Sequence, residues 1–409
     1  MSKSDNSLRG LKIVVVGAGP GGLTFARTAS ANGANITVIE RAGNPYGKNS
    51  GYTDRSFNLT LNEVGRKILG NARSWRGGTD VVGRAIHNFK NSDTIKYTQY
   101  GEGDRARLTS VPRPVLRQNL VDIVEEHGVK ISFDTKVIEV EPNLGKVACE
   151  NKDAAKKNIE ADIIVLADGI HSLSDAFITA MPDGLLNRRQ DPLSYVSVML
   201  GQNVSKSLSS HHMHFWHKTG SESVAIGMPN SDGTVATLLI SPYKGVSDEN
   251  PFSASDQAIE RLERDFPEVL DLDPSLAEQV KGRKLGHFHY KSITNYVLGE
   301  KCIVVGDAGS ASPPWAGFGA NTAIYSGDAL ARFLIGCSGD IKKAFLGYER
   351  YKLALADLVL DYASEHGEFL NKEVAENPEK RPIGPVLGQI INKTIENTDI
   401  PDGVELLSF

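Results

Sequence analysis

The chain has 409 residues, of which 40% are hydrophobic and 23% are charged, and its formal net charge is −5. This length is typical of two or three domains, and the absence of a long basic run argues against a nucleic-acid or acidic-membrane partner. No apolar stretch resembles a secretory signal or approaches the ~18 residues that span a bilayer, so we expect a cytoplasmic protein without a membrane anchor. The cysteines, Cys149, Cys302 and Cys337, form no CxxC pair, which argues against a zinc site or a redox disulfide.

The start of the chain has the pattern of a βαβ unit. Residues 11–16 read LKIVVV, a short β-branched run that is typical of a buried parallel strand. A helix is expected over 23–32, where Gly33 ends it, and a second strand over 35–39.

The rest of the chain divides into segments of different texture. The first group contains helices over 62–69 and 113–127, strands over 130–133 and 163–167, and a hairpin over 135–150. The middle third has the alternation of a mixed sheet, with strands over 194–200, 212–216, 223–228 and 235–240 and a helix over 256–266. A buried strand returns at 302–305, and helices follow over 320–333 and 341–370.

A glycine-rich turn follows the first strand. Residues 17–22 read GAGPGG, which has the G-x-G-x-x-G spacing of a dinucleotide-binding turn. Gly17 permits the tight turn, Gly19 lets the backbone approach a diphosphate, and Gly22 lets the helix pack on the strand. Pro20 lies at the start of that helix, whose N-terminus offers free N–H groups and a positive dipole end to phosphates.

Glu40 ends the second strand, about 20 residues beyond the turn, and is placed to accept hydrogen bonds from ribose hydroxyls. We include its neighbour Arg41 among the candidate cofactor-binding residues. The alternative is a glycine-rich turn that binds nothing, and the motif alone does not separate FAD from NAD.

Two further apolar strands end in an aspartate beside a glycine. The first runs into Asp168 and Gly169, and the second into Gly306 and Asp307. A carboxylate at the C-terminal end of such a strand lies over the crevice where α/β sheets bind ligands. The alternative is that each aspartate only caps a loop or a helix.

In this order, the three motifs resemble those of the single-component flavoprotein aromatic hydroxylases. Residues 314–321 read PWAGFGAN and match the P-x-x-G-x-G-x-N loop of that family. The resemblance implies that this loop and the helix after it bind the flavin, through Pro314, Gly317, Gly319, Ala320 and Asn321. Arg113 matches the family's R-x-x-L-x-x-x-L pattern, in which the arginine contacts FAD.

Within this family, the chain is most similar to the kynurenine 3-monooxygenases. Segments 54–61, 83–87, 99–101, 214–216 and 227–233 carry this resemblance. It implies that Arg84 and Tyr100 hold the substrate carboxylate, a task that suits a guanidinium fork and a phenol. The alternative is that Arg84 is only a surface cation and Tyr100 only a core residue.

The chain departs from the family pattern in several places. Trp315 and Ala316 stand where the substrate and flavin are expected to meet, and the family has an aromatic residue or histidine in place of Ala316. Lys352 stands in place of a C-terminal arginine. Kynurenine itself is therefore one expectation, and another aromatic acid or amine is the alternative.

The resemblance implies a function. It is an FAD-dependent monooxygenase that uses NADPH or NADH and O2 to hydroxylate a small, kynurenine-like aromatic substrate through a C4a-hydroperoxyflavin. The flavin carries the chemistry, so no catalytic side chain is named. Alternatives are a tailoring monooxygenase for a quinolone, an aromatic polyketide or an anthranilate-like acid, and a flavoprotein that does not hydroxylate.

We therefore expect an α/β (α+β) fold with three parts. A Rossmann-like FAD-binding domain comprises 8–75, 105–180 and 285–340, an inserted mixed β-sheet domain for the substrate comprises 76–104 and 181–284, and a C-terminal helical region comprises 341–409. Oligomeric state cannot be inferred. His211, His212, His214 and His217 alternate as a strand, which we favour over a metal site because no cysteine or acid lies nearby.

Overall fold

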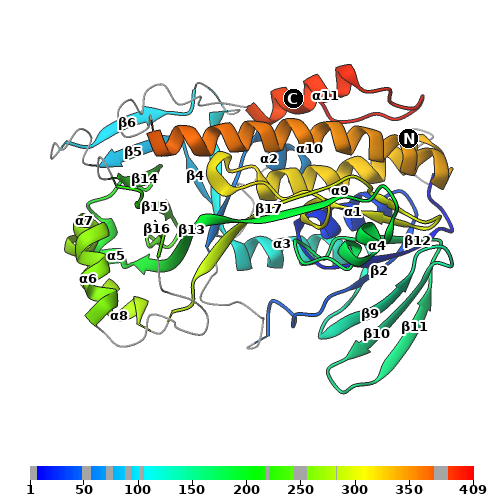
Figure 1. Cartoon of the computed structure of the whole chain (residues 1–409), viewed down its shortest axis with the longest axis horizontal. Helices are drawn as coiled ribbons and strands as arrows, with labels where there is room; N and C mark the ends of the chain where they lie inside the picture. Colours follow the sequence, from blue (N-terminus) through cyan, green and yellow to red (C-terminus); the bar gives the residue numbers. More distant parts are fainter. Residues whose placement is uncertain are drawn as a thin grey trace.

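The structure is a computed structural model, and it describes residues 7–47, 57–70, 77–87, 94–101, 103, 106–217, 221–243, 256–281, 283–372 and 386–409. Asp54 and Arg55, which contribute to the resemblance above, lie outside the described residues. The α/β class is confirmed: a six-stranded, largely parallel sheet and a seven-stranded mixed sheet lie at opposite ends of an elongated chain (Figure 1).

The six-stranded sheet has the order β18-β19-β12-β1-β2-β8, and only β18 is antiparallel to its neighbour. Its strands are β1 (Lys12–Val16), β2 (Asn35–Ile39), β8 (Lys130–Ser132), β12 (Ile163–Leu166), β18 (Val297–Leu298) and β19 (Cys302–Val304). The strands β1, β12 and β19 are almost entirely buried, as their continuous apolar runs predict. Burial of each such Val, Ile or Leu side chain contributes ~1.5–3 kcal/mol.

Helices cover this sheet. α1 (Pro20–Ser30) begins three residues earlier than predicted, because Pro20 occupies its first turn, and Gly33 has the left-handed φ of +92° after its end. The other helices of this part are α2 (Glu63–Leu69), α3 (Arg113–Glu126), α4 (Ser174–Ala180) and α9 (Gly319–Gly336). The predicted hairpin is confirmed as β9 (Thr135–Glu141) and β10 (Lys146–Asn151), and β11 (Lys156–Glu160) completes a three-stranded sheet with them.

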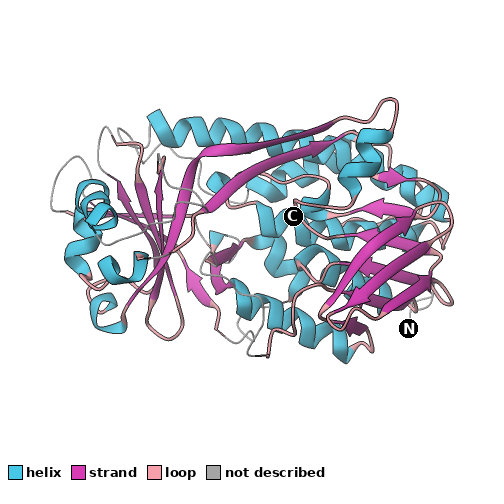
Figure 2. Cartoon of the chain, turned by 60° about the horizontal axis from the view of Figure 1, so that its bottom comes forward, coloured by secondary structure: helices cyan, strands magenta, loops and turns pink. Residues whose placement is uncertain are grey.

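The seven-stranded sheet has the order β17-β13-β16-β15-β14-β5-β6. Its strands are β5 (Gly83–His87), β6 (Lys96–Gln99), β13 (Leu186–Leu200), β14 (His212–His217), β15 (Val224–Pro229), β16 (Val235–Ser241) and β17 (Gly286–Ile293). Strands β13 and β17 extend together from this sheet toward the six-stranded part (Figure 2). The strand β14 confirms the strand interpretation of the histidine-rich segment.

One face of this sheet is covered by α6 (Asp256–Asp265), α7 (Pro267–Leu272) and α8 (Leu276–Val280), which bury a cluster that includes Trp216 and Leu239. The opposite face carries Tyr195, Met228 and Leu238, which pack with Trp315. We call this second surface the inner face.

The remaining elements join the two parts. A three-stranded sheet of β3 (Asn58–Leu61), β7 (Leu108–Pro112) and β4 (Thr79–Val81) lies between them, and α5 (Gln202–Ser205) follows β13. The long helix α10 (Ile341–Lys372) runs along much of the molecule and α11 (Val386–Asn397) packs on it (Figure 1). None of the described helices is both long and apolar enough to cross a bilayer. The division into three domains stays a prediction. The prediction assigns residues 285–340 to the FAD-binding domain, and in the structure β17, at residues 286–293, pairs with β13 of the seven-stranded sheet.

Candidate functional site

Three of the predicted motifs meet at one edge of the six-stranded sheet. Because β1, β12 and β19 are adjacent and parallel, their carboxyl ends bring Gly17, Asp168 and Asp307 together. The contact is close: a Cβ added to Gly17 would lie 2.4 Å from the carbonyl oxygen of Ala167 and 3.0 Å from the Cα of Asp168. We call this edge, with the helix N-termini beside it, the cofactor edge.

The glycine-rich turn fits a diphosphate. Gly17 has a φ of +104°, and a Cβ on Gly22 would lie 2.4 Å from the carbonyl oxygen of Gly17, so both positions require glycine for the fold itself. A Cβ on Gly19, in contrast, would meet nothing within 4 Å. Gly19 precedes α1, and no side chain caps that helix end. The turn therefore presents open backbone and uncapped N–H groups, which is what a phosphate group needs.

Glu40 lies beside this turn and is already held by protein groups. Its carboxylate accepts hydrogen bonds from the backbone N–H of Ala18 and of Ala42, both at 2.7 Å. Arg117, which the sequence analysis did not identify, lies 3.8 Å from the same carboxylate. Arg41 is exposed. The carboxylate is thus fixed at the end of β2, where a ribose hydroxyl would find it.

Asp168 caps the loop that follows β12. Its carboxylate accepts from Ser172 Oγ at 2.5 Å and from the Leu173 N–H at 2.8 Å. Burial raises the pKa of Asp168, although these bonds and the charge of Lys291 act in the opposite direction. Gly169 follows with a φ of +82°. The capping alternative therefore holds for the side chain, while its position at the cofactor edge is as predicted.

Asp307 lies in the short 3-10 turn η4 (Gly306–Ala308), and Gly306 has a φ of +64°. The Asp307 side chain is exposed, yet desolvation by the surrounding protein raises the pKa of its carboxyl. A side chain such as Asp307, which is exposed to solvent yet surrounded by many protein atoms, is typical of the wall of a concave site. Three nearby cations oppose this shift: Arg113, Lys352 and Lys291.

Arg113 is the first residue of α3 and is exposed. A cation at a helix N-terminus opposes the helix dipole, so this arginine does not serve the stability of its own helix. Its charge acts on Asp307, and contact of this arginine with FAD stays a prediction.

The predicted flavin loop leads into α9. It forms the 3-10 turn η5 (Pro314–Ala316), and Gly317 then adopts the left-handed φ of +68°. Pro314, Gly319 and Ala320 are half-buried, and a Cβ on Gly319 would meet nothing within 4 Å. No side chain caps this helix end either.

The side chain of Asn321 holds the loop in place. Its Nδ2 donates to the carbonyl oxygens of Thr60 and Gly317, at 2.8 and 3.1 Å, and its Oδ1 accepts from the Asn62 N–H at 3.0 Å. Asn321 is fully buried. The side chain thus serves the shape of the loop, and cofactor contact by this residue stays a prediction.

The first turn of α1 packs against the first half of α9. A Cβ on Gly327 of α9 would lie 2.2 Å from the carbonyl oxygen of Gly21 of α1, and one on Gly21 would lie 3.0 Å from that of Ala323. Small residues therefore let the two helices approach closely. Each of these helices also has an N-terminus without a side-chain cap, and an uncapped helix N-terminus favours an anionic ligand.

Trp315 projects from the flavin loop onto the inner face of the seven-stranded sheet. It is buried and meets Phe288 edge-on, with ring centroids 5.4 Å apart. Its indole N–H points at Asp191, whose carboxylate also accepts from the Tyr290 hydroxyl at 2.8 Å. Ala316 is half-buried beside it. The two predicted substrate residues therefore join the cofactor edge to an aromatic surface.

Arg84 and Tyr100 lie close together, and their binding of a substrate carboxylate stays a prediction. The Arg84 Cζ lies 5.2 Å from the centroid of the Tyr100 ring, and Arg84 Nε is buried without a hydrogen-bond partner in the described part of the chain. Within the described residues, the Tyr100 hydroxyl donates to the sulfur of Met213 at 3.2 Å, and a thioether is a weak acceptor. Arg84 thus has donor capacity left for a ligand, and the Tyr100 hydroxyl can exchange its weak sulfur acceptor for a stronger one.

The strand register places this pair on the inner face. Arg84 is the cross-strand partner of Met213, and Met213 packs both against Tyr100 and against the cluster that contains Trp315. Because side chains alternate along a strand, Arg84 lies on the same side of the sheet as Trp315.

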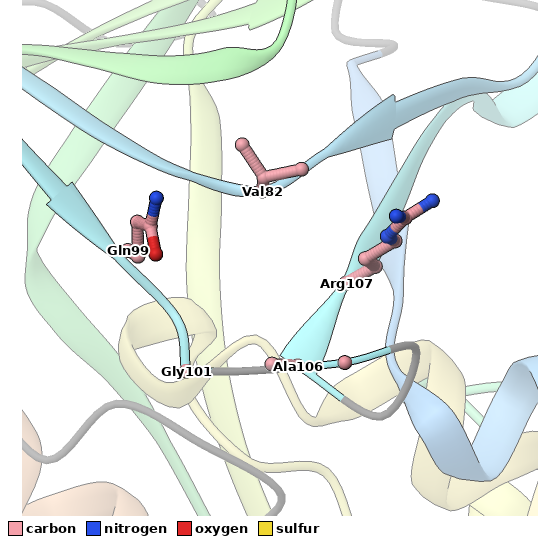
Figure 3. A pocket seen from close by; sticks show the side chains of 6 residues that line it. Val82, Gln99, Gly101, Ala106 and Arg107 are labelled. Atoms are coloured by element: carbon pink, nitrogen blue, oxygen red, sulfur yellow. The ribbon is translucent and has the colours of Figure 1, made fainter.

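Residues next to this pair in the sequence line an open recess of about 320 Å³ (Figure 3). It is lined by Val82, Gln99, Gly101, Gly103, Ala106 and Arg107. Ala106 also packs against Tyr100. The predicted carboxylate-binding residues therefore lie next to an opening to solvent.

Several residues of the site escaped sequence reasoning. Arg117 lies one helical turn after Arg113, and that spacing is a signal that could have identified it. Asp191 lies where the register of β13 against β17 shifts, so a bulge directs it at Trp315, and only the pairing reveals this. Lys291 is fully buried and contacts Asp175.

The comparisons with known proteins agree with this geometry. A family model described as "FAD binding domain" matches residues 10–351. Kynurenine 3-monooxygenase of Xanthomonas campestris pv. campestris is 29% identical over 350 residues, which cover 82% of this chain and 74% of that enzyme. The predicted resemblance is confirmed.

Solved structures share the fold. A tetrameric form of 2-methyl-3-hydroxypyridine-5-carboxylic acid oxygenase has a TM-score of 0.73 at 17% identity, covering 95% of this chain and 98% of that one. PqsL of Pseudomonas aeruginosa in complex with 2-aminobenzoylacetate has a TM-score of 0.65 at 17% identity, covering 95% and 100%.

Proposed function

Because the chain belongs to the FAD binding domain family, we propose that it is an FAD-dependent monooxygenase that hydroxylates a small aromatic carboxylate with NAD(P)H and O2. The observation that carries the substrate class is the pairing of Arg84 with Tyr100 on the inner face, where Arg84 Nε is buried and has no hydrogen-bond partner in the part of the chain that the structure describes. The proposal agrees with the relatives, whose names point to kynurenine and to a pyridine carboxylic acid.

The proposed cofactor residues divide the work between them. The turn at Gly17, Gly19, Pro20 and Gly22 would hold the diphosphate, and Glu40 would hold a ribose, with Arg41 and Arg113 beside them. Asp168, Gly169, Gly306 and Asp307 would line the same edge, and the backbone of the loop from Pro314 to Asn321 would hold the ring. When bound, FAD supplies the redox and oxygen-transfer chemistry.

The proposed task of the protein is to orient the substrate and to keep water away from the reacting ring. The Arg84 guanidinium offers two parallel donors to a carboxylate, and the Tyr100 hydroxyl adds a third. Trp315, held by Asp191 and Phe288, provides a flat apolar wall between substrate and cofactor edge. A dry site matters because side reactions with water then decline.

The domain division given above also forms part of this proposal, with 76–104 and 181–284 binding the substrate. We further propose a cytoplasmic location. The three cysteines are all free and buried, which fits a reducing compartment.

The test is the oxidation of NADPH and of NADH by the purified yellow protein, with and without L-kynurenine and a panel of aromatic carboxylic acids, with products identified by mass. We expect one acid to stimulate oxidation strongly and to gain one oxygen atom. Bound flavin with no stimulation by any acid would contradict the substrate class, and hydrogen peroxide without product would contradict hydroxylation.

A further inference from the structure

Lys352 is a buried cation that the proposed function does not use. It lies in the middle of α10 and is 1% exposed. Its Nζ donates to Ser310 Oγ at 2.8 Å and lies 5.7 Å from the centroid of the Tyr296 ring. A buried ammonium with one neutral hydrogen-bond partner is costly unless a nearby charge compensates it.

The compensating charge belongs to the cofactor edge. Asp307 is the carboxylate whose charge acts on Lys352, and it lies three residues before Ser310 in the same turn. Burial lowers the pKa of Lys352 to about 8, and Asp307 acts in the opposite direction. Lys291, the other fully buried lysine among the described residues, differs because it contacts the Asp175 carboxylate directly.

Other titratable and charged groups face Lys352 and Asp307 from the elements packed around them. Burial raises the pKa of the Tyr296 and Tyr348 hydroxyls far above their usual range. Glu349 accepts from the backbone N–H groups of Tyr296 and Val297, and Asp357 acts on Tyr296. From the other side, Arg113 and Lys291 face Asp307.

Each carboxylate at the cofactor edge is matched by a cation. Arg117 lies beside Glu40, the charge of Lys291 acts on Asp168, and that of Lys352 acts on Asp307. An FAD diphosphate would bring two further negative charges to this edge. Uncompensated like charges so close together would weaken binding.

We propose that Lys352 is a positioning residue for the cofactor: its ammonium offsets the Asp307 carboxylate so that an anionic diphosphate binds beside it, and its bond to Ser310 holds the Asp307 turn. This role rests on FAD binding, and it does not depend on which substrate is hydroxylated.

The proposal has a sign. The protonated lysine favours the anionic cofactor, so FAD binding raises the lysine pKa. The affinity for FAD is then highest below the pKa that Lys352 has in the FAD-free protein. It falls as pH rises through this pKa, by up to about tenfold per pH unit. The fall ends at the pKa of the FAD-bound protein.

The test removes FAD from the protein and titrates it back between about pH 7 and pH 9.5, following flavin fluorescence to obtain Kd. We expect the wild-type Kd to rise at least about fivefold over this range. Lys352→Arg, which stays charged, should bind with a flat profile, and Lys352→Met should bind weakly with a flat profile. The exposed Lys342 on the same helix supplies the control Lys342→Met, which should follow the wild type.

Identical pH profiles for wild type and Lys352→Arg would overturn the proposal. This pair decides the question even where Lys352→Met does not fold. A wild-type chain that binds no FAD at any pH would overturn the cofactor assignment as well, whereas tight binding with a flat profile would overturn only the role of Lys352.

Discussion

The cofactor edge and the inner face use polar groups in opposite ways. At the cofactor edge, protein donors already hold the carboxylates of Glu40 and Asp168. On the inner face, Arg84 Nε has no hydrogen-bond partner among the described residues, and the Tyr100 hydroxyl has only a sulfur. Both regions are rich in charge or hydrogen-bonding groups. At the cofactor edge the side-chain carboxylates are held and the open donors are backbone N–H groups, whereas on the inner face the open donor is a side chain.

This difference teaches how to distinguish a cofactor site from a substrate site in one molecule. On the proposed assignment, a cofactor that stays bound is held by backbone and by fixed side chains, which is the role we predict for Gly19 and for the loop that Asn321 holds. A substrate that binds and leaves would be held by donors that stay unsatisfied, at some cost in stability, while it is absent. Arg84 is such a donor on the proposed assignment. Each prediction below removes one side of this contrast.

The largest effect is expected at Gly17. Gly17→Ala would place a Cβ 2.4 Å from the Ala167 carbonyl oxygen at a φ of +104°, so the turn cannot keep its shape. We expect loss of folded, flavin-containing protein, measured by the ratio of flavin to protein absorbance and by thermal unfolding.

The matched control is Gly19→Ala, since the added Cβ has open space there. This variant should keep the melting temperature of the FAD-free protein and lose FAD affinity, because the methyl group occupies the place of the diphosphate. Equal behaviour of the two variants in both measurements would remove the distinction between a glycine for the fold and a glycine for the ligand.

The next effect is expected at Arg84. Arg84→Met removes the guanidinium that we assign to the carboxylate, and loss of such a charged contact costs ~2–5 kcal/mol, which raises KM roughly 30-fold or more. The FAD-free and substrate-free protein should lose no stability, because the arginine leaves Nε unsatisfied in the buried state. Steady-state kinetics and urea unfolding measure the two quantities. A strongly destabilised variant with an unchanged KM would show that Arg84 is structural.

The sequence predicts the cofactor edge well because its elements are local or follow from topology. The run LKIVVV and the glycines after it specify a strand and a turn directly, and parallel strand order then brings Asp168 and Asp307 to the same edge. The pairing of Arg84 with Tyr100 came from resemblance, since spacing alone would have favoured two unrelated roles.

The residues that sequence reasoning missed depend on long-range pairing. Asp191 reaches Trp315, 124 positions away, only because β13 has a bulge at that point. The strand β17 reads GHFHYKSI, whose histidines and lysine hide its alternation, although Lys291 is fully buried. Such polar residues are buried by packing against segments that are distant in the sequence, and no local sequence pattern encodes this packing.

A third effect tests the histidines on the opposite side of the same sheet. His214 Nε2 donates to the Ser209 carbonyl oxygen at 2.9 Å, so its Nδ1 accepts from His87 Nε2, also at 2.9 Å. Burial lowers the pKa of His87 to about 4. The neutral form is therefore favoured by folding, and stability is lost as pH falls from about 6.5 toward 4, by about 3 kcal/mol in total.

His87→Gln keeps a donor for His214 but does not titrate. The unfolding free energy of this variant should therefore decrease less than that of the wild type as pH is lowered from about 6.5 toward 4. The exposed His127 provides the control His127→Gln, which should retain the wild-type slope. Equilibrium unfolding in urea at several pH values measures this. If the unfolding free energy of His87→Gln depended on pH as it does in the wild type, groups other than His87 would cause the acid sensitivity.

The smallest effect is expected at Tyr100. Tyr100→Phe removes only the hydroxyl, whose partner in the substrate-free protein is the sulfur of Met213, so the unfolding free energy should change by less than about 1 kcal/mol. A hydroxyl that donates to a carboxylate is worth more, ~1.5–3 kcal/mol, so KM should rise roughly tenfold or more while kcat changes little. In the Arg84→Met background the same substitution should matter less, because without the guanidinium the carboxylate is no longer held against the phenol. Additive effects of the two substitutions on KM would mean that Arg84 and Tyr100 act on different parts of the substrate, and the inner face would then contain two separate donors in place of one carboxylate site.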